Sequence, residues 1–163
     1  MASEPAFAIW ITGLPASGKS TITAALKKLL PDAEVLESDA LRRVLGEGYT
    51  EAERDTFYQR MVWIGTLLIK HGVPVIFDAT ANLRRYRDAA RRQIPRFFEV
   101  FVDVPLEVCM ARDPKGIYRD ATANVPGVQA PYEPPEKPDL IIDGLHDSPA
   151  EAARRVLALL SLE

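Results

Sequence analysis

The sequence predicts an α/β domain with a parallel five-stranded sheet, helices on both of its faces and a proline-rich lid. Short apolar runs alternate with longer segments whose apolar residues recur at helical spacing, a pattern typical of parallel strands joined by right-handed crossovers. At the first strand-to-helix junction, residues 13–20 read GLPASGKS and fit the pattern G-x-x-x-x-G-K-[ST] of a P-loop. Together these observations predict a P-loop NTPase-type fold.

The first half of the chain supplies five expected elements. Phe7 to Ile11 is an apolar run that ends just before the loop, and the next segment keeps an apolar stripe until Pro31. Thr50 with Glu53 resembles a capping box that opens a long helix. The expected elements are strand 7–11, helix 21–30, strand 34–37, helix 40–45 and helix 50–70.

The second half continues the alternation. Val73 to Phe77 is almost continuously apolar, as expected for a strand buried on both faces, and it ends at Asp78. The expected elements are strand 73–77, helix 83–94, strand 97–102, helix 106–112, strand 140–142 and helix 150–160. Residues 113–138 contain six prolines and form too long a stretch for a simple connection in a compact domain, so we expect a lid there.

Length and composition favour one domain over residues 1–163. The net charge of −3 argues against binding to nucleic acid or a membrane through bulk charge. The single cysteine, Cys109, excludes an internal disulfide, and its apolar neighbours favour a buried thiol in a reducing compartment. No apolar stretch reaches the roughly 18 residues of a membrane span, and the N-terminus lacks the features of a signal peptide. We therefore expect a cytoplasmic protein.

The P-loop predicts a site for a nucleoside triphosphate. Its glycines allow a tight turn that points backbone N–H groups at a phosphate, and the positive end of the next helix adds to the attraction. Lys19 is expected to reach the β- and γ-phosphates, and the Ser20 hydroxyl to bind Mg²⁺. The loop residues expected to bind ATP are Gly13, Ala16, Ser17, Gly18, Lys19, Ser20 and Thr21.

Three classes of protein use such a site: a GTPase switch, a mechanical ATPase and a small-molecule kinase. The chain has no Asn-Lys-x-Asp element for binding guanine, and the D-x-x-G match at 113–116 follows the fourth expected strand, where a switch is not expected. A mechanical ATPase normally has a larger chain with assembly surfaces. A small domain with a lid favours a kinase, which aligns its substrates and neutralises charge with Mg²⁺ and cations.

Residues that follow the strands should meet at the carboxyl edge of the sheet, where such proteins bind ligands. Asp39 could orient the acceptor hydroxyl or accept its proton, or it could only cap the next helix. Arg42, one turn later, could hold an acceptor phosphate, or could be solvated together with Arg43. Asp78 could hold Mg²⁺ through water, or could cap a turn.

Further cations follow later in the chain. Arg84 and Arg87 lie nearest the end of the third strand and are the members of a basic cluster that could reach a substrate anion. In the expected lid, Arg112, Lys115 and Arg119 could bring positive charge to the transferring phosphate when the lid closes and excludes water.

These residues resemble the adenylylsulfate kinase family over nearly the whole chain. The shared segments are GLPASGKST at 13–21, the aspartate and arginine of SDALR at Asp39 and Arg42, Tyr49-Thr50 with Glu53-Arg54, EVFVDVPLEVCMARDPKGIY at 99–118, Gly127, Pro131-Tyr132-Glu133 and Pro135. The resemblance implies a kinase that uses MgATP to phosphorylate the 3′-hydroxyl of adenosine 5′-phosphosulfate, often as a homodimer. It also implies that Asp39 is the acceptor-orienting base, that Tyr49 stacks on the acceptor base, and that Arg112 and Lys115 belong to a mobile lid.

The sequence departs from the family where the acceptor binds. Phe57 and Gln59 replace the Asn and first Arg of the family's E-N-x-R-R segment, while Arg60 keeps the second Arg. Residues 80–84, TANLR, replace its I-S-P-Y-R segment, and Val125 replaces the Phe that forms the second wall around the adenine. Losing that ring could remove about 1–3 kcal/mol of base stacking. A related acceptor, such as a cytidine diphosphoramidate-type nucleotide or another small alcohol, is therefore an alternative, and a non-catalytic nucleotide-binding module is a third interpretation.

The predicted site combines these assignments. Lys19 and Asp39 are expected to be catalytic, and Ser20 and Asp78 to lie at Mg²⁺. Arg112 joins the residues that bind ATP. The residues expected to bind the acceptor are Arg42, Tyr49, Arg60, Arg84 and Lys115.

Overall fold

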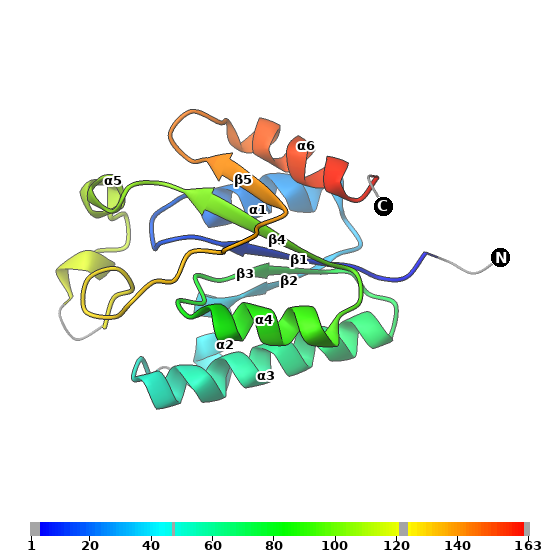
Figure 1. Cartoon of the computed structure of the whole chain (residues 1–163), viewed down its shortest axis with the longest axis horizontal. Coiled ribbons are helices and arrows are strands. Elements are labelled where there is room, and N and C mark those ends of the chain that lie inside the picture. Colours follow the sequence, from blue (N-terminus) through cyan, green and yellow to red (C-terminus); the bar gives the residue numbers. More distant parts are fainter. Residues whose placement is uncertain (1–3, 47, 121–123, 162–163) are drawn as a thin grey trace.

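A parallel five-stranded sheet forms the middle layer of the molecule (Figure 1). The computed structural model describes residues 4–46, 48–120 and 124–161. The strands are β1 Ala8–Thr12, β2 Glu34–Glu37, β3 Val75–Asp78, β4 Phe97–Asp103 and β5 Leu140–Asp143, in the spatial order β2-β3-β1-β4-β5. Each neighbouring pair is parallel, and β1, which leads into the P-loop, is central. The predicted fold class is confirmed.

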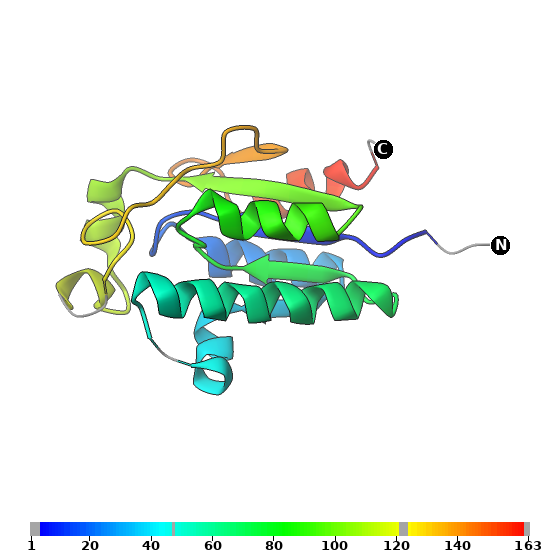
Figure 2. The ribbon, with the colours of Figure 1, turned by 60° about the horizontal axis from the view of Figure 1, so that its bottom comes forward.

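The described part of the chain forms six α-helices. They are α1 Lys19–Leu29, α2 Ser38–Leu45, α3 Glu51–Lys70, α4 Arg84–Gln93, α5 Leu106–Arg112 and α6 Pro149–Leu159, with a short 3-10 helix at Ile117–Arg119. Figures 1 and 2 show α1 and α6 together over one face of the sheet and α3 and α4 over the other. The strand ends that carry the site are therefore held between two helical layers.

The core under α3 is closely packed. Trp10 of β1 is fully buried and stacks on Phe77 with ring centroids 4.5 Å apart, and its indole N–H donates to Ala79 O at 3.1 Å. A Cβ on Gly65 of α3 would lie 2.2 Å from Phe77 Cζ, so only glycine allows this close approach. Burying each such large apolar side chain contributes about 1.5–3 kcal/mol. This packing fixes the ends of β1 and β3, which border the site.

The third strand and the second helix begin at other residues than the sequence predicts. The third strand begins at Val75 because the Val73 N–H donates to Leu68 O, at the end of α3, instead of joining the sheet. The short second helix begins at Ser38, with Glu37 as its N-cap and no side-chain capping bond. Asp39 therefore lies inside the first helical turn, and the interpretation of Asp39 as only a cap is wrong.

The proline-rich segment 113–138 crosses the carboxyl end of the sheet (Figure 1). Its residues 121–123 lie outside the described residues. The Tyr118 hydroxyl donates to Pro15 O at 2.6 Å, which ties the segment to the P-loop, and the Glu133 N–H donates to Asn82 O at 2.8 Å. The segment therefore contacts both the P-loop and the β3–α4 loop. In the described residues, no helix has the length and apolar character needed to cross a bilayer.

Candidate active site

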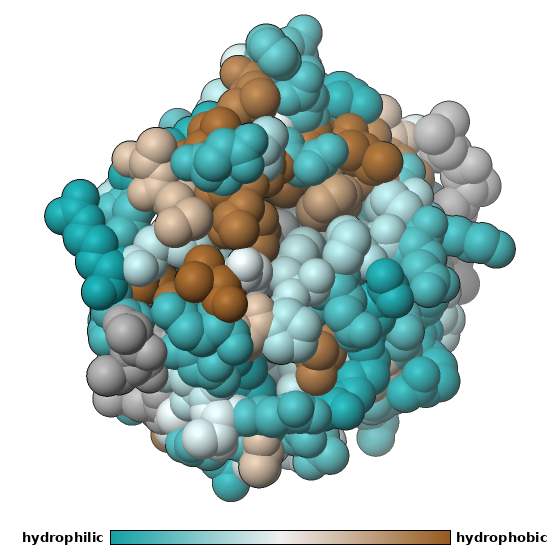
Figure 3. All heavy atoms as spheres, turned by 60° about the vertical axis from the view of Figure 1, so that its left-hand side comes forward, coloured by the Kyte–Doolittle hydropathy of each residue, from teal (hydrophilic) through white to brown (hydrophobic). Residues whose placement is uncertain are grey.

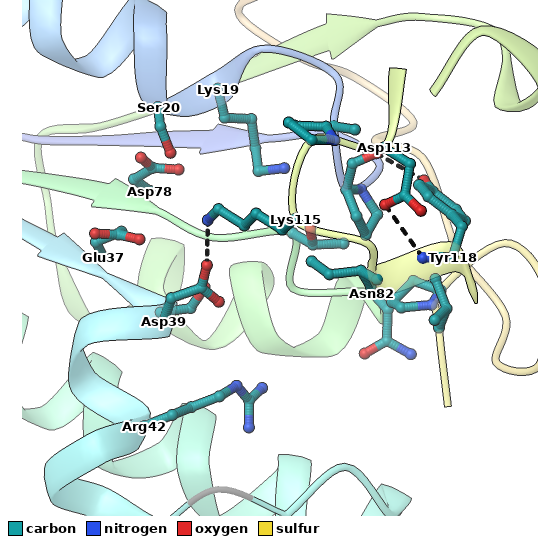
Figure 4. A pocket seen from close by; sticks show the side chains of 18 of the residues that line it. Lys19, Ser20, Glu37, Asp39, Arg42, Asp78, Asn82, Asp113, Lys115 and Tyr118 are labelled. Atoms are coloured by element: carbon teal, nitrogen blue, oxygen red, sulfur yellow. Dashed lines mark hydrogen bonds and ion pairs between the residues drawn. The ribbon is translucent and has the colours of Figure 1, made fainter. Parts of the chain in front are cut away.

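A cavity of about 610 Å³ lies at the carboxyl ends of the strands. Its walls come from the P-loop, the β2–α2 junction, the first half of α3, the β3–α4 loop and the proline-rich segment, and Figure 4 shows their polar side chains converging. The outer face at this end of the molecule mixes apolar and hydrophilic side chains (Figure 3). The predicted site residues that line the cavity are Ala16, Gly18, Lys19, Ser20, Thr21, Asp39, Arg42, Tyr49, Asp78, Arg112 and Lys115.

The P-loop has the close backbone packing that its glycines allow. A Cβ on Gly13 would lie 2.7 Å from Val102 O, and Gly18 has a φ of 102°, which favours glycine. Ala16 also has a positive φ of 66°, so the loop stores backbone strain, as functional sites often do. Among the described residues, nothing pairs with the buried Ser17 hydroxyl. These features fit a preformed nest for a phosphate group.

Lys19 folds back over this nest. Its Nζ donates to Gly13 O at 3.1 Å and to Leu14 O at 3.0 Å. Burial lowers the pKa of Lys19 from its ordinary value, while the nearby Asp78 and Asp39 carboxylates act in the opposite direction. The ammonium group is thus held above the loop by carbonyl oxygens, which phosphate oxygens can replace as stronger partners.

Asp78 and Ser20 lie side by side next to Lys19 (Figure 4). Burial raises the pKa of Asp78, and Lys19 and the Ser20 hydroxyl partly offset this rise. Carboxylate and hydroxyl oxygens are ligands that Mg²⁺ accepts, together with substrate phosphates and water. In the described residues, no three His, Cys, Asp or Glu side chains form a metal site by themselves. The donor set therefore fits a Mg²⁺ that is shared with phosphate oxygens.

Asp39 is paired with the proline-rich segment. Lys115 Nζ lies 2.6 Å from Asp39 Oδ2, and both side chains are about half-exposed. The hydrogen bond to Asp39 raises the pKa of Lys115 from its ordinary value. Glu37 lies on the same edge, and its pKa is raised by burial and by the neighbouring Asp78 and Asp39 carboxylates. The carboxylates of Glu37, Asp39 and Asp78 therefore lie close to the ammonium groups of Lys19 and Lys115 in the cavity.

The half of the cavity beyond Asp39 is built around two arginines. Arg42 is 6% exposed, and its guanidinium carbon lies 4.1 Å from the centroid of the Phe57 ring and 4.6 Å from that of Tyr49. Arg54 is also buried and lies 5.6 Å from the centroid of the Tyr49 ring. The interpretation of Arg42 as solvated is wrong, because aromatic rings cover its guanidinium group.

Two predicted substrate-binding arginines do not line the cavity. Arg60 is exposed on α3 and donates to Leu45 O at 2.8 Å. Arg84 donates to Pro134 O at 2.7 Å and pairs with Glu136 at 3.2 Å. The structure does not support their predicted contact with the acceptor, because partners outside the cavity hold both guanidinium groups.

The cavity wall also includes Glu37, Arg54, Tyr58 and Asn82, which were not among the predicted site residues. Arg54 directly follows the capping-box residue Glu53 and belongs to a segment shared with the family, a signal that could have identified it. The Tyr58 hydroxyl accepts a hydrogen bond from the Ala81 N–H at 3.1 Å. No local sequence pattern indicates Asn82, since its place depends on contacts with residues near 131.

Known proteins are similar to this chain in sequence and in fold. The family model described as Adenylylsulphate kinase matches residues 5–143. The adenylyl-sulfate kinase of Synechococcus sp. (strain JA-3-3Ab) is 38% identical over 162 residues, covering 93% of this chain and 92% of that protein. The adenylyl-sulfate kinase of Deinococcus deserti is 43% identical over 142 residues, covering 81% of this chain and 78% of that protein.

Solved structures point to the same family as the relatives found by sequence. The APS kinase of Mycobacterium tuberculosis in complex with AMPPNP and APS has a TM-score of 0.90 at 35% identity, covering 98% of this chain and 99% of that chain. A gluconokinase from Sinorhizobium meliloti, at a TM-score of 0.65 and 20% identity over 98% of this chain and 94% of that chain, shows the fold alone. On these grounds the chain belongs to the adenylylsulphate kinase family and is a phosphotransferase.

Proposed function

We propose that this protein transfers the γ-phosphoryl group of ATP to the 3′-hydroxyl of adenosine 5′-phosphosulfate. The observation that carries the proposal is one cavity with Lys19 toward one end, Arg42 toward the other, and Asp39 between them (Figure 4). Arg54 also lines this cavity, and both it and Arg42 lie close to the Tyr49 ring. The M. tuberculosis relative, whose structure holds AMPPNP and APS, supports a division into a nucleotide half and an acceptor half.

The P-loop half would hold ATP and Mg²⁺. Its backbone N–H groups and Lys19 bind the phosphates, and Arg112, which lines the cavity, adds a further cation. Ser20 would bind Mg²⁺ directly and Asp78 would bind it through water. When bound, Mg²⁺ neutralises charge on the phosphate oxygens.

Asp39 orients the acceptor hydroxyl and accepts its proton as the oxygen bonds to phosphorus. Lys115 pairs with Oδ2 of the Asp39 carboxylate, so a hydroxyl that binds at this oxygen would displace Lys115. The released ammonium group is then free to stabilise charge that develops on the transferring phosphoryl group. Exchange of one lysine between two partners thus couples movement of the lid to the reaction.

The two buried arginines bind the anionic end of the acceptor. Guanidinium groups match phosphate and sulfate oxygens with paired N–H donors. The Tyr49 and Phe57 rings shield Arg42 from solvent, which strengthens its interaction with an anion. Tyr49 is 37% exposed and lines the cavity, so part of its ring remains available to an acceptor base.

ADP release with MgATP and a panel of acceptors tests the proposal. We expect robust turnover with adenosine 5′-phosphosulfate. Turnover only with a pyrimidine nucleotide or another small alcohol would overturn the acceptor assignment and keep the kinase. ATP binding without turnover on any acceptor would favour a non-catalytic regulatory module instead.

A related nucleotide is the second candidate acceptor, and Val125 favours it. Val125 is fully buried in the cavity wall. The acceptor base therefore meets one aromatic ring, Tyr49, where two rings would hold a purine more tightly by about 1–3 kcal/mol. Such a site leaves room for a base of another size.

The proposal extends to the organisation of the protein. Residues 1–163 form one kinase domain with residues 113–138 as its lid, and the protein works in the cytoplasm as a homodimer. The buried free thiol of Cys109 fits a reducing compartment. A relative from Thiobacillus denitrificans is described as a hexameric APS kinase, so light scattering on the purified protein is the direct measurement of its assembly.

A further inference from the structure

The side chain of Asn82 is buried in the cavity wall and only half satisfied. It is 4% exposed and lines the cavity from the β3–α4 loop. The backbone is fixed on both sides, because the Ala81 N–H donates to the Tyr58 hydroxyl and the Asn82 carbonyl accepts from the Glu133 N–H. Ala81 has a φ of 44°, so the chain turns sharply just before Asn82. The fold therefore sets the direction of this side chain.

The contacts of the amide fix its orientation. Asn82 Nδ2 donates to Pro131 O at 3.0 Å. A flipped amide would place two oxygens against each other with no proton between them, so the nitrogen must face Pro131. Oδ1 lies on the other side of the amide and is buried in the wall of the cavity that Asn82 lines (Figure 4). No described residue donates to this oxygen, and water does not reach it.

A buried oxygen without a donor is unfavourable, by about tenfold to a hundredfold in an equilibrium constant. A ligand that supplies the missing donor recovers this loss, whereas a ligand without the donor leaves the oxygen unpaired. Such a group therefore discriminates between ligands that differ only in that donor. Asn82 has this property at a position where the sequence departs from its family.

The neighbours of Asn82 indicate which part of the acceptor meets it. The anionic groups of the acceptor belong with Arg42 and Arg54, and its reacting hydroxyl belongs with Asp39. The remaining parts are the ribose 2′-hydroxyl and the base, and the cavity that Asn82 lines also includes the buried apolar side chain of Val125, which suits a flat ring. A neutral amide oxygen in such a wall can accept from an N–H donor on a planar ring, and the apolar surface around it favours the ring over a hydroxyl.

Building on the proposed function, we propose that Asn82 determines acceptor specificity: its Oδ1 accepts a hydrogen bond from the exocyclic amino group of the acceptor base. Asn82 lines the cavity while its Oδ1 is shielded from solvent, so this contact requires the wall to adjust when the acceptor binds. A base with an oxo group at the same place is rejected, because it sets two acceptor oxygens against each other.

The test compares two acceptors that differ only in this group. They are adenosine 5′-phosphosulfate and inosine 5′-phosphosulfate, in which an oxo group replaces the amino group. We expect wild-type kcat/KM to be about tenfold or more higher for the adenosine compound. We expect Asn82→Ala to bring the ratio to within about threefold of one. The ratio does not depend on how much of the variant is folded, because both acceptors are measured on the same preparation.

Asn124→Gly is the matched control. Asn124 Nδ2 donates to Tyr49 O at 2.9 Å, and its φ of 47° suits glycine, so this change also deletes a carboxamide near the acceptor half. We expect Asn124→Gly to keep the wild-type ratio, since its amide already has a partner. Equal kcat/KM for both acceptors in the wild type, or a ratio that Asn82→Ala does not change, would overturn the assignment while turnover itself upholds the kinase. Absence of turnover with both acceptors would overturn the proposed function and this assignment together.

Discussion

The two halves of the cavity are built in different ways. The phosphate half is local, because one loop and the helix after it, residues 13–21, supply nearly all of it. The acceptor half is assembled from distant segments: Arg42 on α2, Arg54 on α3, Asn82 after β3 and Val125 in the proline-rich segment. Arg54, for example, donates to Asn124 O, 70 positions away. Substitutions at single distant positions can therefore change the acceptor and leave the ATP half intact.

Lys19→Ala should break the phosphate half most severely. It removes the cation that lies over the nest, so we expect turnover to fall by about 10²–10³-fold and ATP to bind more weakly. Steady-state kinetics and titration with an ATP analogue measure the two effects. Lys27→Ala, on the same helix but outside the cavity, is the control. Unchanged ATP affinity in Lys19→Ala would refute the phosphate role.

Arg87→Met should damage the fold and leave ATP binding unchanged. Arg87 is fully buried and pairs with Glu99 at 3.0 Å, and the only other cation that pairs with this carboxylate among the described residues is Arg91, at 3.7 Å. Removing Arg87 should therefore lower the free energy of unfolding by up to about 3–5 kcal/mol. Urea denaturation measures this loss. The KM for ATP in the remaining folded enzyme should stay near the wild-type value, and an unchanged free energy of unfolding would contradict the structural role of Arg87.

Arg54→Ala should affect the acceptor half alone. Loss of one buried charge-assisted contact should lower kcat/KM for the acceptor by about 10- to 100-fold, while the KM for ATP stays within about twofold of wild type. Arg60→Ala, one of the arginines outside the cavity, should change neither value by more than about twofold. Equal losses for both arginines would show that the boundary between the two halves is misplaced.

Lys115→Met should have the smallest effect on stability. Both members of its pair with Asp39 are about half-exposed, so the change should cost less than about 1 kcal/mol of unfolding free energy. The folded pKa of Lys115 is raised, so this contribution is fully present below the unfolded pKa of about 10.4 and is lost as pH rises through the folded value. Urea denaturation of wild type and variant should give a constant difference between about pH 6 and pH 9. A difference that disappears within this range would contradict the pairing.

The sequence was sufficient for the phosphate half because its chemistry depends on neighbours within one turn. Gly13, Gly18 and Lys19 need their loop and helix, and the spacing specifies both. The same reasoning was less successful for arginines on helices. Helical spacing indicates where a side chain starts but not what it meets, so Arg84, held by the segment 134–136, and Arg60, held by Leu45, could not be separated from Arg42.

Asn82 shows a second limit. Its buried amide depends on a positive φ at Ala81, on the Tyr58 hydroxyl and on the Pro131 carbonyl, none of which has a local sequence signature. The resemblance to the family directed attention to the replaced segment 80–84. Only the packed structure identifies the unpaired oxygen in it.

The most direct test follows the labelled γ-phosphate of ATP through a single turnover in the presence of adenosine 5′-phosphosulfate. If Asp39 addresses the acceptor hydroxyl beside the triphosphate, wild-type enzyme should move the label onto the acceptor. Asp39→Asn should bind ATP equally well and transfer the label about 10²–10⁴-fold more slowly. Transfer by Asp39→Asn at the wild-type rate, or label released only as inorganic phosphate by the wild type, would contradict the account.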